Sequence, residues 1–151
     1  MQFFKRKIMY PHRRTNETSK TIDKLFAEYA LHLKRVRDSL PEGARALADV
    51  TFHDATIKEV KHLSKKELQI VIEGGGYGTL AYGEYTLSFS GLRKAWVPYT
   101  IVGDTWLYEE MHLSVDSGFD YQVLLVKDEI RIQATDVRLI PRSSGPHRRP
   151  T

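Results

Sequence analysis

The chain has 151 residues, of which 41% are hydrophobic and 28% charged, as is typical of a globular protein with a proper core. It has no cysteine, which excludes disulfides, thiolate metal sites and a cysteine nucleophile. No apolar run reaches the length of about 20 residues that spans a bilayer, and the charged start does not fit a signal peptide. We therefore expect a cytoplasmic protein that makes no membrane contact.

The net charge of +4 comes from the two ends of the chain. Residues 1–14 carry five basic side chains and residues 141–151 carry three, with no acidic residue in either segment. The remaining body has 15 basic and 19 acidic residues. Because nucleic-acid-binding domains usually concentrate positive charge on a folded face, a nucleic-acid partner is not expected. Contact through the basic ends remains a weaker alternative.

A helix is predicted over about residues 18–40. Thr18 or Ser19 is expected to cap its first turn, and Pro41 is expected to end it. Before this helix, residues 1–14 are too apolar for a free tail, so an edge strand or a short docked segment is expected. The helix has apolar residues at the three- and four-residue spacing that forms one stripe: Ile22, Leu25, Phe26, Tyr29, Leu33, Val36 and Leu40. The stripe favours packing on a sheet, with a coiled-coil partner as the alternative.

From Val50 onward the hydrophobic period changes from 3.6 to 2, which indicates strands. Six strands are predicted, at residues 51–62, 67–73, 83–92, 105–115, 119–127 and 129–140. Short loops between them indicate antiparallel pairing in a meander. Residues 93–104 are less regular. The alternation slips near residues 57–60 and again at Thr135-Asp136, where bulges are expected.

Together these elements predict a single α+β domain over residues 1–140. In it, the N-terminal helix packs on a curved antiparallel sheet or half-open barrel of about six strands. Residues 141–151 are basic and contain three prolines, a composition that predicts a disordered tail.

Five polar residues are candidates for catalysis or metal binding. His53 and Asp54 form the only His-Asp dipeptide, and the fourth predicted strand adds Glu109, Glu110 and His112. By strict alternation Glu109 falls on an apolar face, where a carboxylate is costly and its pKa rises. These groups would suit an acid–base pair or a divalent metal. The structural alternatives are that Asp54 accepts backbone amides at a bend and that Glu109 pairs with a lysine or arginine. No cofactor and no metal are expected.

Four aromatic residues are candidates for a binding surface: Tyr77 and Tyr82 near a glycine cluster, and Trp106 and Tyr108 on the fourth strand. The cluster at residues 74–78 lacks the Gly-Lys-Ser/Thr ending and the following helix of a phosphate-binding loop, so a hairpin loop is predicted. Because aromatic side chains are enriched in protein interfaces, another protein is the expected partner. A homo-oligomer is the alternative.

Three stretches form a pattern: Met1-Gln2-Phe3-Phe4-Lys5 with Tyr10, then Leu40-Pro41-Glu42 leading to Phe52-His53-Asp54-Ala55-Thr56-Ile57, then residues 107–139. The pattern resembles a bacterial family of unknown function with a short helical lead and a Leu/Phe-His-Asp motif opening an antiparallel β region. The closing pair of strands is similar to small β-rich immunity proteins of bacterial toxin systems. The resemblance covers residues 1–10 and 40–140, leaves residues 93–104 without a counterpart, and implies no catalytic residues.

The expected function is therefore that of a non-catalytic protein-binding module, of an immunity-like kind, in the bacterial cytoplasm. The first alternative is a metal-binding protein or a hydrolase that uses the His-Asp pair and the carboxylates of the fourth strand. Nucleic-acid contact through the basic ends is the weaker one.

Overall fold

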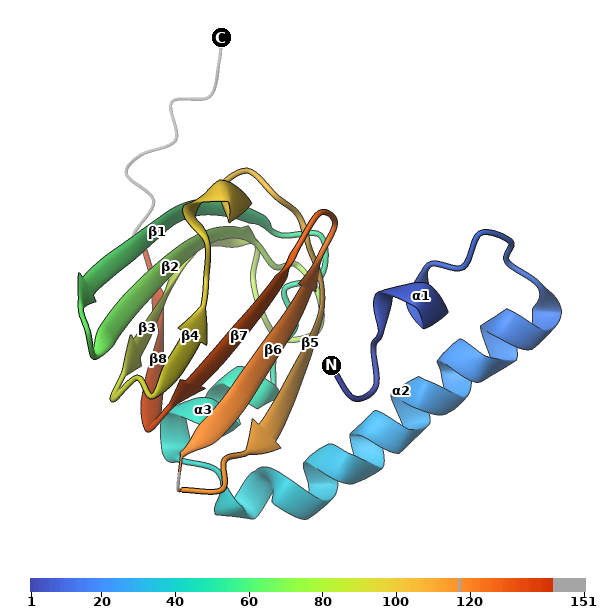
Figure 1. The fold of residues 1–151 in the computed structure, drawn as a ribbon, viewed down its shortest axis with the longest axis horizontal. Coiled ribbons are helices and arrows are strands. Elements are labelled where there is room, and N and C mark those ends of the chain that lie inside the picture. The colour runs from blue at the N-terminus through green and yellow to red at the C-terminus, as the bar shows by residue number, and fades with distance from the viewer. Residues whose placement is uncertain (117, 143–151) are drawn as a thin grey trace, which may run out of the picture.

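The computed structural model describes residues 1–116 and 118–142, which form two four-stranded antiparallel sheets and a set of N-terminal helices (Figure 1). The first sheet has the order β1-β2-β3-β8, with strands Thr56–Ser64, Glu67–Gly74, Gly83–Ser90 and Asp136–Pro141. The second has the order β4-β7-β6-β5, with strands Lys94–Trp96, Glu129–Ala134, Phe119–Leu125 and Trp106–Leu113. The sheets do not close into a barrel, and the predicted α+β class is confirmed.

The described residues form eight strands where six were predicted, because one predicted strand is divided between the two sheets and the irregular segment 93–104 contributes the short β4. The segment 129–140 divides at Thr135, so that β7 pairs with β6 while β8 pairs with β3 in the other sheet. The slip at Thr135-Asp136 is thus a change of sheet and not a bulge. The irregular segment 93–104 contains the short β4 and a 3-10 turn, Tyr99–Ile101. The bulge predicted near residues 57–60 is confirmed as a register shift between Ile57 and Glu59.

The main core lies between the facing sides of the two sheets. Phe89 of β3 meets Phe119 and Tyr121 of β6, with ring centroids 6.3 Å apart in both pairs. Full burial of each large apolar side chain stabilises the fold by about 1.5–3 kcal/mol relative to its exposure. The other fully buried side chains of this core include Ile57, Leu68, Ile70, Ile72, Leu87, Trp106, Val123, Leu125 and Ile132.

Helix α2 (Asn16–Val36) runs obliquely beside the second sheet (Figure 1). It begins earlier than predicted because its N-cap is Thr15, which exchanges hydrogen bonds with Thr18 in a capping box. Two of its side chains bind the backbone of β5. The Met111 N–H donates to the Tyr29 hydroxyl at 2.7 Å, and His32 Nε2 donates to the Met111 carbonyl at 2.9 Å. His32 and Tyr29 thus attach the helix to the edge of the second sheet.

Two shorter helices complete the N-terminal helical region. Helix α1 (Arg6–Met9) follows an N-terminal segment that docks against the molecule and does not form an edge strand. Apolar residues of this segment, of α1 and of α2 form a second cluster, consisting of Phe3, Phe4, Met9 and Ile22. Helix α3 (Glu42–Ala48) follows a 3-10 turn at Arg37–Ser39 and packs on β8. None of the helices within the described part of the chain has the length and hydrophobicity needed to span a membrane.

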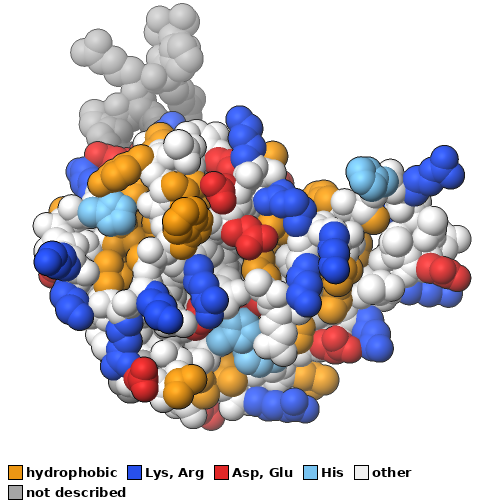
Figure 2. Space-filling model, in the orientation of Figure 1, with side chains coloured by type: hydrophobic (Ala, Val, Ile, Leu, Met, Phe, Trp, Pro, Cys, Tyr) orange, Lys and Arg blue, Asp and Glu red, His pale blue; other side chains and the backbone are white. Residues whose placement is uncertain are grey.

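The predicted tail at residues 141–151 lies outside the described residues from 143 onward. Pro141 ends β8, and Arg142 is held in place because its N–H donates to the Glu84 carbonyl at 2.8 Å. On the face drawn in Figure 2, Lys and Arg side chains are interspersed with hydrophobic and histidine side chains.

Candidate functional site

A register shift in β5 decides which of its side chains face the core. The pairing of β5 with β6 slips between Trp106 and Tyr108. Trp106 consequently turns inward and is 0% exposed, on the side of the strand that Glu109 also occupies. Strict alternation predicted opposite faces for these two residues. The structure therefore places Trp106 in the core, where it cannot contact a partner directly.

Glu109 lies at the floor of a groove between α2 and β5. Its Oε2 accepts a hydrogen bond from Trp106 Nε1 at 2.9 Å. Burial raises the pKa of Glu109, and the hydrogen bonds from Trp106, from the Thr51 side chain and from the Phe52 backbone offset only part of this effect. No Lys or Arg among the described residues forms an ion pair with it, so the predicted pairing with a base does not occur there.

The groove has a volume of about 340 Å³, and four aromatic residues line it. Phe4 stands at the centre of these rings, with centroids 5.1 Å from Phe26 and from Tyr29 and 5.5 Å from Tyr108. Phe26 and Tyr108 meet edge to face at 5.6 Å. Such contacts add to the stabilisation from burial and fix the rings in place. The remaining wall is formed by Ala48, Asp49, Val50 and Thr51.

The rings continue from the groove across the surface. The Tyr108 ring lies 5.1 Å from that of His53 and 6.4 Å from that of Tyr10, and the His53 ring lies 5.9 Å from that of Tyr77. Tyr10 is 47% exposed, Phe26 42% and Tyr77 44%. We call Tyr10, Phe26, His53, Tyr77 and Tyr108 the aromatic face. Burial raises the pKa of Tyr10 to about 12, so this residue is a neutral phenol.

His53 and Asp54 form part of the support of this face. His53 Nδ1 donates to the Leu107 carbonyl at 2.6 Å, and His53 Nε2 lies 3.6 Å from Asp54 Oδ1. Asp54 has a φ of 64°, and it accepts a hydrogen bond from the Tyr77 hydroxyl at 3.0 Å. This bond raises the pKa of Tyr77. Tyr82 stands apart from the face, 70% exposed, and donates to Glu73.

Glu110 and His112 hold the N-terminal segment. The Glu110 carboxylate is fully buried and accepts the backbone N–H groups of Gln2 at 2.9 Å, Phe3 at 2.7 Å and Phe4 at 2.5 Å. It also accepts from His112 Nε2 at 2.9 Å. Burial alone would raise the pKa of Glu110, but the bonds from His112 and the three amides outweigh it, and the pKa is lowered.

The five polar candidates thus occupy three separate environments. His53 and Asp54 support the aromatic face, Glu109 lines the groove, and Glu110 with His112 binds the N-terminal segment. Neither His53 nor Asp54 lines the groove. In the part of the chain that the structure describes, no group of three or more His, Asp or Glu residues is arranged to hold a metal ion. The geometry therefore gives no support to a metal centre built from these residues.

Sequence reasoning missed four residues of the site, namely Phe4, Tyr10, Phe26 and Tyr29. The sequence marked each of these four residues as part of an apolar segment. Phe4 and Tyr10 lie in a segment too apolar for a free tail, and the other two belong to the apolar stripe of the helix. What the sequence did not contain was the position of that stripe over β5.

Comparison with known proteins places residues 5–132 in a family described as "Protein of unknown function (DUF4085)". No curated protein and no solved structure matches the chain. The predicted resemblance to a family of unknown function is confirmed, while the immunity-like kinship and the bacterial origin stay predictions.

Proposed function

The chain belongs to this family of unknown function, and we propose that it acts as a non-catalytic protein-binding module whose contact surface is the aromatic face. The observation that carries the proposal is the unbroken run of ring contacts from Phe26 through Tyr108 and His53 to Tyr77. The cytoplasmic location and the immunity-like role predicted from the sequence belong to this proposal and rest on the sequence alone.

The physical support comes from exposure combined with rigidity. Tyr10, Phe26 and Tyr77 leave almost half of their surface to solvent, yet ring contacts and the Tyr77–Asp54 bond already restrict them. Aromatic side chains that are ordered before binding lose little conformational entropy on association. They are also enriched among the residues that dominate binding energy.

The hydrogen bonds that already engage Glu110 and His53 within the fold support a non-catalytic role. General acid–base catalysis needs two titratable groups within reach of one substrate. Here Glu109 reaches the groove, whereas Glu110 is enclosed by backbone amides and His53 Nδ1 is committed to a carbonyl.

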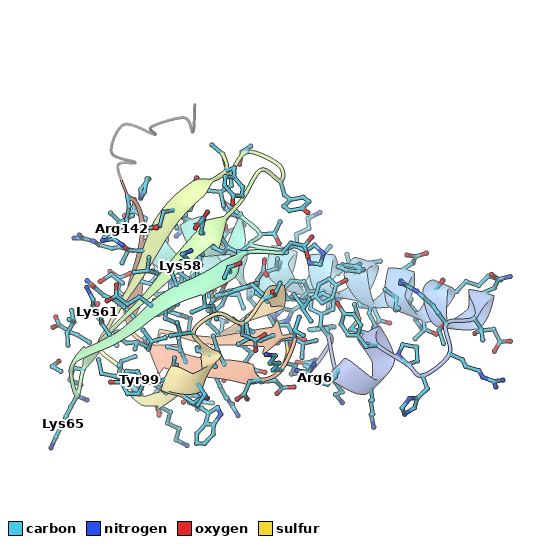
Figure 3. All side chains as sticks on the ribbon, turned by 90° about the horizontal axis from the view of Figure 1, so that it is seen from above. Arg6, Lys58, Lys61, Lys65, Tyr99 and Arg142 are labelled. Carbon is cyan, nitrogen blue, oxygen red and sulfur yellow. The ribbon has the colours of Figure 1, made fainter. Side chains whose placement is uncertain are left out.

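The basic ends give less support to a nucleic-acid partner, because two of their arginines are engaged within the fold (Figure 3). The Arg6 guanidinium donates to the carbonyls of Leu125 and Val126 at 2.7 Å and of Asp128 at 3.0 Å. Arg142 forms an ion pair with Glu84 at 2.7 Å.

The test is a quantitative pull-down with wild-type protein and with single variants, followed by affinity measurement on any purified partner. Phe26→Ala and Tyr77→Ala are expected to weaken binding about tenfold or more, as for interface residues of this type. Tyr99→Ala is the matched control, because Tyr99 is 64% exposed and lies away from α2 (Figure 3). Recovery of chaperones alone, or a partner that responds only to the control, would reject the proposal.

A further inference from the structure

We propose that the groove between α2 and β5 takes a basic side chain, lysine or arginine, of a protein partner, held by the Glu109 carboxylate at the floor and aromatic rings at the walls. This inference rests on the proposed function, because the aromatic face surrounds the mouth of the groove. It adds the chemistry that the partner must present.

The groove contains a carboxylate that no described Lys or Arg neutralises. Glu109 accepts hydrogen bonds from the side chains of Trp106 and Thr51 and from the Phe52 backbone, all of them neutral donors, and it forms no ion pair with a described Lys or Arg. A buried carboxylate without a cation is costly, and it is stabilised strongly when a cation arrives. A partner's ammonium or guanidinium group would therefore gain a strong electrostatic contact that water provides poorly at this depth.

The walls supply the second feature that favours a cation. Phe4, Phe26, Tyr29 and Tyr108 all line the groove. The negative face of an aromatic ring attracts a cation within about 6 Å of its centroid. Rings also pack against the apolar stem of lysine or arginine. A carboxylate flanked by four rings is thus complementary to an alkyl chain that ends in a positive charge.

The size of the groove suits one side chain. Its volume of about 340 Å³ lies at the lower end of the range of about 300–1,000 Å³ that is usual for small-ligand pockets. At its rim, Asp49 is already paired with Arg37 through a bond of 3.0 Å from Nε to Oδ1. The rim therefore adds little net charge, and Glu109 sets the preference for a cation.

Binding of a cation is expected to depend on pH, because it requires Glu109 to be ionised. Burial raises the pKa of Glu109, so affinity should rise as the pH rises through that value and then level off. The titratable groups that face Glu109 from the surrounding elements are Tyr29 on α2, Asp49 after α3, His53 before β1 and Tyr121 on β6. Burial raises the pKa of Tyr29 and of Tyr121, so both stay neutral through this range.

The experiment is an NMR titration of the full chain with Nα-acetyl-lysine methylamide, Nα-acetyl-arginine methylamide and the neutral Nα-acetyl-norleucine methylamide, at matched ionic strength. The indole N–H of Trp106 reports on the site because it donates to Glu109. Trp96 is 65% exposed on β4 and serves as the internal control. We expect a saturable shift of the Trp106 signal with at least one cationic probe, a weaker effect with norleucine, and loss of the difference at low pH.

Two variants separate the contributions. Glu109→Gln keeps the shape of the side chain and should abolish the preference for cations over norleucine. Phe26→Ala removes a half-exposed wall ring without opening the core, and should weaken cation binding about three- to fivefold, the size expected for one cation–π contact. A far-ultraviolet circular dichroism spectrum and the dispersion of the NMR spectrum verify that each variant is folded.

Equal shifts with all three probes, or an unchanged cation preference in Glu109→Gln, would overturn the inference. A partner that depends on Tyr77 and Phe26 but not on Glu109 would do the same while leaving the proposed function intact. If no partner depends on the aromatic face yet the cationic probes bind selectively, the proposed function fails and the groove chemistry stands.

Discussion

Glu109 and Glu110 are neighbours in the sequence, yet they point to opposite sides of β5 and their pKa values shift in opposite directions. Glu109 faces a groove, where the bonds from Trp106, Thr51 and the Phe52 backbone do not outweigh the effect of burial, whereas Glu110 is surrounded by three amides and an imidazole. At the scale of single residues, the environment on each face of the strand therefore determines whether a carboxylate stabilises or destabilises the fold.

For Glu110 we predict that Glu110→Gln destabilises the protein by about 2–4 kcal/mol at neutral pH, because an amide cannot accept all the bonds that the carboxylate accepts. The lowered pKa means that the contribution of the wild-type residue is present above the unfolded-state pKa of about 4.3 and is lost as the pH falls through the folded-state value. Urea denaturation of both proteins across this range measures the effect. A variant that matches the wild type at pH 7 would contradict the role of Glu110 as the clamp of the N-terminal segment.

For Glu109 the stability of the protein depends on pH in the opposite direction. A raised folded-state pKa means that the folded state holds the proton more tightly, so stability is fully present below the unfolded-state pKa and declines as the pH rises through the folded-state value. Glu109→Gln lacks this decline, and we predict that it melts at the same or a higher temperature than the wild type at pH 7 to 8. Melting curves at pH 4 and pH 8 provide the comparison. A large loss of stability at pH 8 alone would show that the ionised form is needed by the fold itself.

At the scale of elements, α2 depends on the N-terminal segment beneath it. Ile22 is the one buried residue among the 21 that form the helix. Besides its direct bonds to β5, the helix packs on Phe3 and Phe4 through the rings of Tyr29 and Phe26. The N-terminal segment is therefore held between two partners. Glu110 of β5 binds its backbone on one side, and α2 packs on its side chains on the other.

This arrangement predicts the effect of Phe4→Ala. Phe4 is 2% exposed, and loss of such a ring costs about 3–5 kcal/mol locally. We expect hydrogen exchange of α2 amides to accelerate strongly, while exchange in β2, β3 and β6 changes little. Leu63→Ala is a control, because Leu63 is 54% exposed on β1. Uniform acceleration across both sheets would instead mean that the N-terminal helical region and the sheets unfold as one unit.

At the scale of the whole molecule, the chain passes from the second sheet back into the first at one residue between β7 and β8. Thr135 separates β7 from β8, and its N–H donates to the carbonyls of Ser90 and Gly91 at 3.2 Å. Helix α3 closes the far edge of the first sheet by packing on β8. A Cβ at Gly43 would lie 1.7 Å from the Val137 carbonyl oxygen, so only a glycine permits this approach.

We therefore predict that Gly43→Ala separates α3 from β8 and destabilises the protein by about 1–3 kcal/mol, the usual cost of overpacking. Glu42→Ala lies on an exposed position of the same helix and is expected to change stability by less than about 0.5 kcal/mol. Chemical denaturation midpoints distinguish the two. An unchanged midpoint for Gly43→Ala would mean that α3 can shift without cost.

The helix, the class of fold and most strands follow from periodicity, because 3.6- and 2-residue patterns are local properties of the sequence. The division of residues 129–140 between two sheets does not, since the slip in alternation at Thr135-Asp136 is equally typical of a bulge and only tertiary pairing tells the two apart. The inward turn of Trp106 depends on one extra residue in the register with β6. The aromatic face joins five distant segments, so local patterns named Tyr77 and Tyr108 but not their connection.

The bonds from Tyr29 and His32 to Met111 have a consequence for solubility. The strand β5 ends its sheet, and these two side chains occupy the N–H and the carbonyl of Met111, which another strand would otherwise pair with. Helix α2 thus keeps the edge of this sheet from pairing with a strand of another molecule. A partner or a truncation that lifts the helix would leave β5 open as a template for intermolecular sheet growth.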